Sequence, residues 1–150
     1  MIPTVHLQSE PLDPLALREA ARLPRAGAVV VFEGCARDHH GGRSVDQLAY
    51  EAFPPMALAQ LGEVRNEAIA RFGLEACLIH HRLGVVPLTE AAVVVVTASA
   101  HRREAFDAAL WIMDEIKRRV PIWKREAYTA GDEAWVEGER REGGAPAAGR

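Results

Sequence analysis

The apolar run at residues 91–97 constrains the fold of this chain more than any other segment. It reads Ala-Ala-Val-Val-Val-Val-Thr, so every position before the threonine is apolar. A short run of this kind, rich in β-branched residues, is typical of a fully buried strand. A helix is predicted next, from about Arg102 to Arg119, and it must end before Pro121 because the residue before a proline disfavours the α conformation.

Further strands and helices are predicted before and after the strand at residues 91–97 and the helix at residues 102–119. Asp13-Pro14 can cap and start a helix that runs to about Arg22. Pro54-Pro55 opens a second helix, which Gly73 ends. The remaining strand patterns are short: residues 28–32, a segment near Val45, Leu48 and Tyr50, and residues 77–81, 122–128 and 135–136. Strands and helices alternate only loosely, which favours an α+β fold over a doubly wound parallel sheet.

Composition limits the class of protein. The chain has 150 residues, of which 49% are hydrophobic and 26% are charged, and its formal net charge is -3. This is enough apolar sequence for one buried core. The acidity argues against a dedicated nucleic-acid-binding protein, which usually carries a basic excess. We expect a single domain over residues 1–137 and a disordered tail over residues 138–150, which is rich in glycine, alanine and arginine.

No segment has the pattern of a membrane span or a secretory leader. The longest apolar runs fall well short of the ~20 residues that cross a bilayer. The first residues lack a basic stretch followed by an apolar one. Two cysteines cannot form a disulfide framework, so the simplest interpretation is a soluble protein in a reduced, cytoplasmic setting.

The predicted helix 102–119 carries two cations on its apolar side. At about 100° per residue, its apolar arc comprises Ala105, Phe106, Ala109, Leu110, Ile112, Met113 and Ile116. Lys117 lies on this arc near one end and Arg102 near the other, where each could border a cleft. Alternatively, both long side chains extend into solvent from the helix ends, and the helix dipole favours a cation at Lys117.

A second lysine follows this helix. Pro121 forces a turn, which could bring Lys124 back near Lys117. Two lysines that close would lower each other's pKa unless an anion lies between them, an arrangement that suits phosphate binding and acid–base chemistry. Alternatively, Lys124 and Arg125 form an ordinary exposed pair on an edge strand, where charges oppose aggregation.

The start of the same helix could bind an anion. Its free N–H groups attract negative charge, Ser99 can cap it, and His101 and Arg102 add a titratable group and a guanidinium. His101 could instead have only a capping or packing role. Arg37, in a glycine-bearing polar segment after the strand 28–32, is a further candidate cation, or else a solvated loop arginine.

The paired histidines, the two cysteines and Trp111 predict little further chemistry. Adjacent histidines at 39–40 and 80–81 would point to opposite faces of a strand, and no cysteine or carboxylate completes a metal-ligand spacing. Cys35 is expected in a loop, where its thiol could react, and Cys77 in an apolar strand, where it is inert. Trp111 falls on the polar side of the helix 102–119, where it either marks a protein interface or is covered by another element.

Five motifs stand in order along most of the chain. They occupy residues 27–34 with Arg37, 50–56, 81–87, 99–102 and 117–126. The combination of Ser-Ala-His-Arg with Lys-x-x-x-Pro-x-Trp-Lys-Arg-Glu is specific. In order and spacing, these motifs resemble those of the large, catalytic subunit of molybdopterin synthase, and the match extends over roughly residues 27–137.

The resemblance implies an α/β hammerhead fold with an additional antiparallel β subdomain, and a dimer of large subunits. Each large subunit of this family binds a small ubiquitin-like sulfur carrier, which completes a heterotetramer. The carrier's Gly-Gly C-terminus enters the active site as a thiocarboxylate. Two sulfurs pass to cyclic pyranopterin monophosphate and form the dithiolene of molybdopterin, and the resemblance implies no metal or other cofactor for this subunit.

The resemblance also assigns roles to residues. It implies Lys117 and Lys124 as catalytic lysines, Arg37, His101 and Arg102 as ligands of pterin and phosphate, and Phe32 and Met113 as lining residues. Thiocarboxylate and cyclic phosphate are both anions, so a cluster of cations suits their approach. Cys35 stands where we would expect Thr or Lys in relatives. The family takes its sulfur from the carrier, so we expect no catalytic role for this thiol.

Two other functions are compatible with the residues alone. A non-catalytic module could bind a phosphorylated ligand or a protein through the same cationic cleft. Such a module should tolerate Lys117→Arg, whereas proton transfer by the lysine should fail in that variant. Single-stranded nucleic-acid binding is disfavoured by the acidity and by an aromatic content of only 6%.

Overall fold

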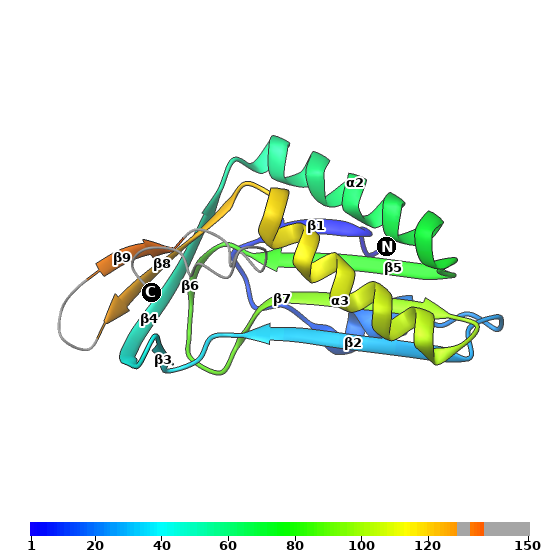
Figure 1. The fold of residues 1–150 in the computed structure, drawn as a ribbon, viewed down its shortest axis with the longest axis horizontal. Coiled ribbons are helices and arrows are strands. Elements are labelled where there is room, and N and C mark those ends of the chain that lie inside the picture. The colour runs from blue at the N-terminus through cyan, green and yellow to red at the C-terminus, as the bar shows by residue number, and fades with distance from the viewer. Residues whose placement is uncertain (129–132, 137–150) are drawn as a thin grey trace.

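The computed structural model describes residues 1–128 and 133–136, and this part of the chain folds into two β-sheets and three helices (Figure 1). In chain order the elements are β1 (Val5–Gln8), α1 (Pro14–Ala20), β2 (Ala28–Cys35), β3 (His39–His40), β4 (Arg43–Ala52), α2 (Pro54–Phe72), β5 (Ala76–Arg82), β6 (Gly84–Val86), β7 (Ala91–Ser99), α3 (Arg102–Arg119), β8 (Ile122–Tyr128) and β9 (Glu133–Val136). The tail expected over residues 138–150 lies outside the described residues. Among the helices that are described, none is long and apolar enough to cross a membrane.

The first sheet has the strand order β1-β5-β7-β2, with β7 between two antiparallel neighbours. The valines of β7 alternate between two cores. Val93 and Val95 pack against α2 and α3, whereas Val94 and Val96 pack against α1. The strand predicted at residues 91–97 is confirmed and extends to Ser99. Its apolar run is continuous because successive side chains of a strand point to opposite faces and both faces are covered here.

Local sequence patterns set the start of α1 and the end of α2 as predicted. The Asp13 side chain accepts a hydrogen bond from the Ala16 backbone N–H at 3.0 Å, and Pro14 begins α1. That helix ends at Ala20, slightly before the predicted position. α2 is followed by Gly73 with a φ of 64°, the left-handed conformation that glycine adopts without steric cost.

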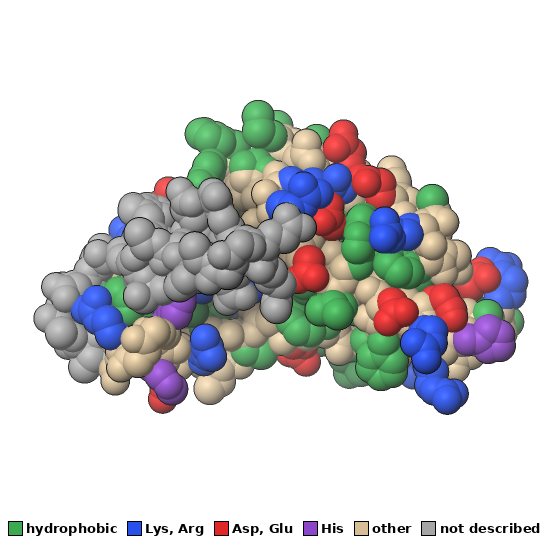
Figure 2. All heavy atoms as spheres, viewed as in Figure 1, with side chains coloured by type: hydrophobic (Ala, Val, Ile, Leu, Met, Phe, Trp, Pro, Cys, Tyr) green, Lys and Arg blue, Asp and Glu red, His purple; other side chains and the backbone are tan. Residues whose placement is uncertain are grey.

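The buried face of α3 differs from the predicted arc. Its buried residues are Ala105, Ala108, Ala109, Ile112 and Ile116. Phe106 and Leu110, which the arc placed toward the core, are 61% and 60% exposed. The reason is the width of the sheet: α2 lies along one flank of α3, but on the other flank the sheet ends at its edge strand β2 (Figure 1). Apolar side chains are therefore visible at the surface over α3 (Figure 2).

α2 covers Trp111, the second of the two alternatives for this residue. The Phe72 ring meets the indole edge to face, with 5.9 Å between ring centroids. The Arg71 guanidinium lies 5.4 Å from the centre of the same indole. Trp111 is thus part of the contact between α2 and α3.

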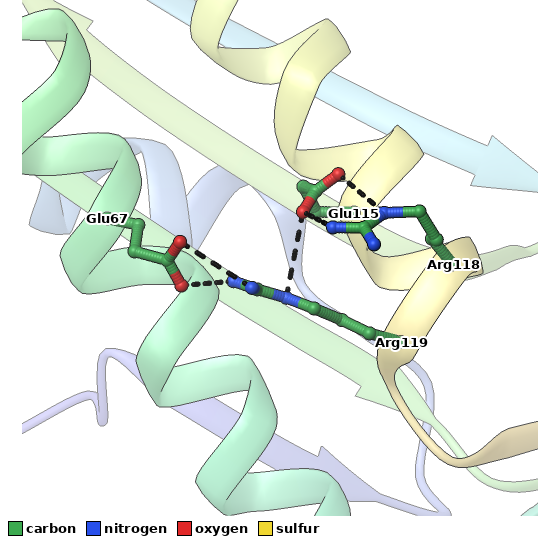
Figure 3. Close-up of polar contacts among 4 residues, drawn as sticks. All are labelled: Glu67, Glu115, Arg118 and Arg119. Carbon is green, nitrogen blue, oxygen red and sulfur yellow. Dashed lines mark hydrogen bonds and ion pairs between the residues drawn. The ribbon is translucent and has the colours of Figure 1, made fainter.

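Arg119 ties the last turn of α3 to α2 (Figure 3). Its guanidinium donates to the Glu67 carboxylate on α2, and its Nε lies 3.8 Å from Glu115 Oε1 on α3. Arg118 donates to the Glu115 carboxylate at 2.5 and 3.1 Å, and this hydrogen bond lowers the pKa of Glu115. The turn that carries Lys117 is therefore held by ion pairs within α3 and between the two helices.

The second sheet is antiparallel and lies at one end of the first (Figure 1). Its strand order is β3-β4-β8-β9, and β6 also pairs with β4. The strand predicted at residues 122–128 is confirmed as β8, and it pairs with the long strand β4. Together the sheets and helices confirm an α+β fold with an additional antiparallel subdomain.

Candidate active site

A cavity of about 340 Å³ lies between the two sheets and α3. Of the seven residues predicted for the site, five line it: Phe32, Arg37, Met113, Lys117 and Lys124. They come from β2, the segment after β2, α3 and β8. The cavity therefore joins residues that are far apart in the sequence.

Both lysines reach this cavity from consecutive elements. Lys117 lies in the last turn of α3, which ends before Pro121. On β8, the alternate residues Ile122, Lys124 and Glu126 face the cavity, as the two-residue period of a strand requires. The turn at Pro121 thus returns Lys124 to the cavity that Lys117 lines, and both side chains are half-buried.

Arg37 adds a third cation to the cavity lining. It belongs to no helix or strand, because it lies between β2 and β3. Among the described residues that line the cavity, Arg37, Lys117 and Lys124 are accompanied by one carboxylate, that of Glu126. An excess of cations around a concave surface attracts anions. The cavity is therefore suited to a ligand that carries phosphate or carboxylate groups.

His101 and Arg102 line a different cavity, of about 370 Å³, at the other end of α3. Arg102 and Lys117 are separated by about 22 Å along the helix axis, at roughly 1.5 Å per residue. Each of the two cations predicted on α3 does border a cleft. Within one chain, however, the structure does not bring His101 and Arg102 into the cavity of the lysines.

The cap predicted at Ser99 is wrong. The Ser99 hydroxyl donates to the His101 carbonyl oxygen at 2.5 Å, and the N-cap residue of α3 is His101, which makes no side-chain capping bond. The physical reason is that β7 continues through Ser99, so the helix begins two residues later than the cap would require.

A buried hydrogen-bond network borders the cavity that both lysines line, where His40 and Glu126 are lining residues. The His40 Nδ1 lies 2.6 Å from Glu126 Oε1, and the Tyr128 hydroxyl donates to the same oxygen at 3.3 Å. Burial, together with the Glu126 carboxylate, raises the pKa of Tyr128, which keeps its proton for this bond. The sequence analysis did not single out this network. Side chains alternate between the two faces of a strand, so the strand predicted at 122–128 places Glu126 on the same face as Lys124. This pattern could have indicated that Glu126 belongs to the site.

His81 gives the cavity an uncharged wall. The side chain is buried, its Nδ1 lies 2.8 Å from the Arg82 carbonyl oxygen, and its ring meets that of Tyr50 edge to face. Burial lowers the pKa of His81 to about 4, although the backbone hydrogen bond opposes this change. At neutral pH the imidazole is therefore neutral and adds no charge to the cation cluster.

We expect His81 to make the fold acid-sensitive. As the pH falls from about 6.5 to about 4, the unfolded chain binds a proton at this histidine and the folded chain does not, so the free energy of unfolding falls by up to about 3 kcal/mol. In His81→Phe the loss between about pH 7 and about pH 4.5 should be smaller by about 2 kcal/mol. Urea unfolding of both proteins at the two pH values measures the difference. Equal losses would contradict the prediction.

Cys35 ends β2, so the loop expected around it is wrong. β2 runs beyond the predicted end at Phe32 because its last residues still pair with β7, across a register shift between Gly34 and Cys35. Cys35 lines the same cavity as Lys117 and Lys124. Burial, and secondarily the Glu33 carboxylate, raises the pKa of Cys35. The thiol therefore stays protonated at neutral pH, which makes it a weak nucleophile.

Within residues 1–128 and 133–136, no group of three or more His, Cys, Asp or Glu side chains is arranged to hold a metal ion. In β3, His39 is exposed and His40 is buried, so these neighbours do face opposite sides. The cavity that both lysines line presents amines, a guanidinium, a carboxylate, imidazoles and the Cys35 thiol. Such groups bind anions, stabilise developing negative charge and transfer protons.

Comparison with known proteins decides the family. The model of the MoaE protein family matches residues 7–119. The chain belongs to this family. This chain is 47% identical over 114 residues to the molybdopterin synthase catalytic subunit of Pyrococcus abyssi, and the match covers 76% of each protein. The resemblance found in the sequence motifs is thereby confirmed.

Solved structures agree with this assignment. The structure matches the crystal structure of molybdopterin synthase from Staphylococcus aureus with a TM-score of 0.84 and 32% identity, over 90% of this chain and 98% of that chain. A complex of subunits 1 and 2 of the molybdopterin-converting factor from Helicobacter pylori shares the fold, with a TM-score of 0.73 and 19% identity over 90% of this chain and 91% of that chain.

Proposed function

We propose that this chain is the catalytic subunit of a molybdopterin synthase. In this function it transfers sulfur from the C-terminal thiocarboxylate of a small carrier protein to cyclic pyranopterin monophosphate. The observation that carries the proposal is the convergence of Arg37, Lys117 and Lys124 on one cavity. Both reactants are anions, and the cations compensate the repulsion between them. Two successive transfers complete the dithiolene of molybdopterin.

The two lysines have different tasks in this mechanism. Lys117 lies nearest the carrier's terminal carbonyl group, and Lys124 lies nearer the substrate. The thiocarboxylate sulfur attacks the substrate, the cyclic phosphate opens, and the resulting acyl-linked intermediate is released by hydrolysis. A cation beside each developing oxyanion lowers the barrier, and a lysine amine can carry the proton between groups. Arg37 binds the phosphate, and Phe32 and Met113 line the site.

The carrier is the protein partner in this proposal. One solved structure with the same fold is itself a complex of two subunits of the molybdopterin-converting factor. A C-terminus that ends in Gly-Gly has no side chains near its tip, so it can enter a cavity of about 340 Å³ in an extended conformation. The sulfur arrives on the carrier, and the proposal assigns no cofactor to this chain.

A second copy of the chain completes the site in this proposal. His101 and Arg102 have the chemistry of an anion site but line a cavity of their own. Between them and Lys117, α3 exposes Phe106 and Leu110 beside the edge strand β2. Exposed apolar surface next to an open strand edge suits a symmetric dimer, in which each copy can add residues to the other's site. With two carriers bound, the assembly is a heterotetramer.

A reconstituted assay tests the function. The purified protein is mixed with a thiocarboxylated carrier and cyclic pyranopterin monophosphate, and molybdopterin is measured as its fluorescent oxidised derivative. Product that depends on all three components supports the proposal. If the carrier is shown to bind and no product forms, with several carriers tried, the chain is a binding module and the proposal fails.

Cys35→Ser is expected to keep the turnover number within about threefold of wild type, because a protonated thiol contributes little nucleophilic reactivity. Serine preserves the size and a hydrogen-bonding group at the end of β2. The reconstituted assay measures the rate for both proteins. A loss of about a hundredfold or more would instead assign this thiol a part in sulfur transfer.

A further inference from the structure

We propose that His40 is a positioning residue, which places Arg37 relative to Lys124 through its hydrogen bond to Glu126. The inference rests on the proposed function and assigns a task to a buried pair that the mechanism above does not use. His40 follows Arg37 by three residues, and Glu126 follows Lys124 by two. The pair therefore joins the segment that carries one cation to the strand that carries the other.

The contact between His40 and Glu126 is short and shielded from solvent. Nδ1 of His40 and Oε1 of Glu126 are 2.6 Å apart, and the two side chains are 11% and 3% exposed. Both residues line the cavity. A hydrogen bond to a buried carboxylate is stronger than one at the surface, and a carboxylate that loses such a partner is costly to keep in place.

The backbone connects these two regions only indirectly, because β4 lies between the segment around Arg37 and β8. The carbonyl of Ala36 accepts from Thr89, and the carbonyl of Asp38 accepts from Val45, so the segment around Arg37 is bonded to the turn before β7 and to β4. β3 pairs with β4 and not with β8. The His40 side chain reaches Glu126 on β8 directly, so this contact adds a side-chain link between the segment of Arg37 and the strand of Lys124.

Loss of the link has a specific consequence for binding. Without His40, Glu126 keeps the Tyr128 hydroxyl at 3.3 Å and is open to a rearrangement toward the cations of the cavity. Arg37 would then lose its fixed distance to Lys124, and an anionic substrate that contacts both would bind more weakly. The chemical step at Lys117 would be affected much less, because α3 is held separately by Arg119 and Glu67.

The experiment compares His40→Leu, His40→Asn and His39→Leu in the reconstituted assay. His40→Leu should raise the KM for cyclic pyranopterin monophosphate about tenfold, with kcat within about threefold of wild type. The side-chain amide of asparagine places a donor close to the position of Nδ1, so His40→Asn should restore most of the loss. His39→Leu is the matched control: it changes the exposed neighbour in the same strand and should leave KM and kcat unchanged.

A double-mutant cycle separates positioning from general destabilisation. If His40 acts through Arg37, then His40→Leu should add little to the KM of Arg37→Ala, whereas independent effects would multiply. An unchanged KM in His40→Leu, a failure of His40→Asn to restore binding, or multiplicative effects with Arg37→Ala would each overturn the proposal. Should His40→Leu not fold, the same cycle is run with Glu126→Gln, which keeps the size of the side chain and removes its charge.

The test also distinguishes this proposal from the proposed function. Affinity for cyclic pyranopterin monophosphate is measured by calorimetry on the same proteins without a thiocarboxylated carrier. If wild type binds the compound but makes no product, the proposed function fails. In that case the positioning role is still supported by weaker binding in His40→Leu and normal binding in His40→Asn, and is overturned by equal binding in all three.

Discussion

Lys117→Ala is expected to lower the turnover number by roughly 10²- to 10⁴-fold, which is the usual contribution of a positioned acid–base group. Lys117 lines the cavity from the last turn of α3, and that turn is held by ion pairs of Arg119 and Arg118. The fold should therefore survive the substitution while the amine disappears. Molybdopterin formation in the reconstituted assay measures the rate, and calorimetry should show that the carrier's affinity changes by less than about threefold.

Two further variants control this experiment. Lys117→Arg keeps the positive charge, but its guanidinium stays protonated and cannot exchange protons near neutral pH. It should retain carrier binding and lose turnover, whereas a non-catalytic binding module would tolerate it. Arg125→Ala removes a cation from the other face of β8 and should leave the rate within about threefold of wild type. Near-normal turnover in Lys117→Ala would refute the assignment of this lysine.

A mixture of two inactive variants is expected to recover activity if the site is shared between copies of the chain. Lys117→Ala and Arg102→Ala should each lose most turnover when they are produced alone. In a mixed dimer one site combines the intact Arg102 of one copy with the intact Lys117 of the other. Random pairing of the two variants should therefore restore about a quarter of the wild-type rate. The measurement is the reconstituted assay on protein obtained by co-expression of the two variants.

A variant that carries both Lys117→Ala and Arg102→Ala supplies the control. Every shared site takes one of the two residues from each copy, so the double variant leaves no intact site in a dimer with any partner, wild type included. Sedimentation should show the dimer in every sample. Recovery near zero in confirmed mixed dimers would show that Arg102 and Lys117 act within one chain or not in one site. Full activity of Arg102→Ala alone would show that this arginine is dispensable.

The elements that sequence patterns predicted well are those whose formation depends on neighbouring residues. The valine run of β7, the Asp13 cap of α1 and the left-handed Gly73 after α2 all follow from local geometry and local hydrogen bonds. The return of Lys124 toward Lys117 was also predictable, because a proline between a helix and a strand leaves few paths for the chain. Predictions failed where a distant element decided the outcome.

α3 and Cys35 illustrate these failures. Helical periodicity defines an apolar arc but not which part of it meets the sheet, and the edge at β2 left Phe106 and Leu110 exposed. Trp111, on the polar side by the same periodicity, is covered because α2 lies beside it. The pairing of β2 with β7 extended the strand through Cys35, although its glycine and polar neighbours favoured a loop.

The sequence by itself determined the α+β class, the order of the main strands and helices, and the family, because these depend on local pattern and on motifs in fixed order. Only the tertiary structure decided that Arg37, Lys117 and Lys124 line one cavity while Arg102 lies at the far end of α3. It alone paired His40 with Glu126 across 86 positions of sequence. The physical reason is that strand pairing and helix packing bring together segments whose separation in the chain contains no information about their distance in space.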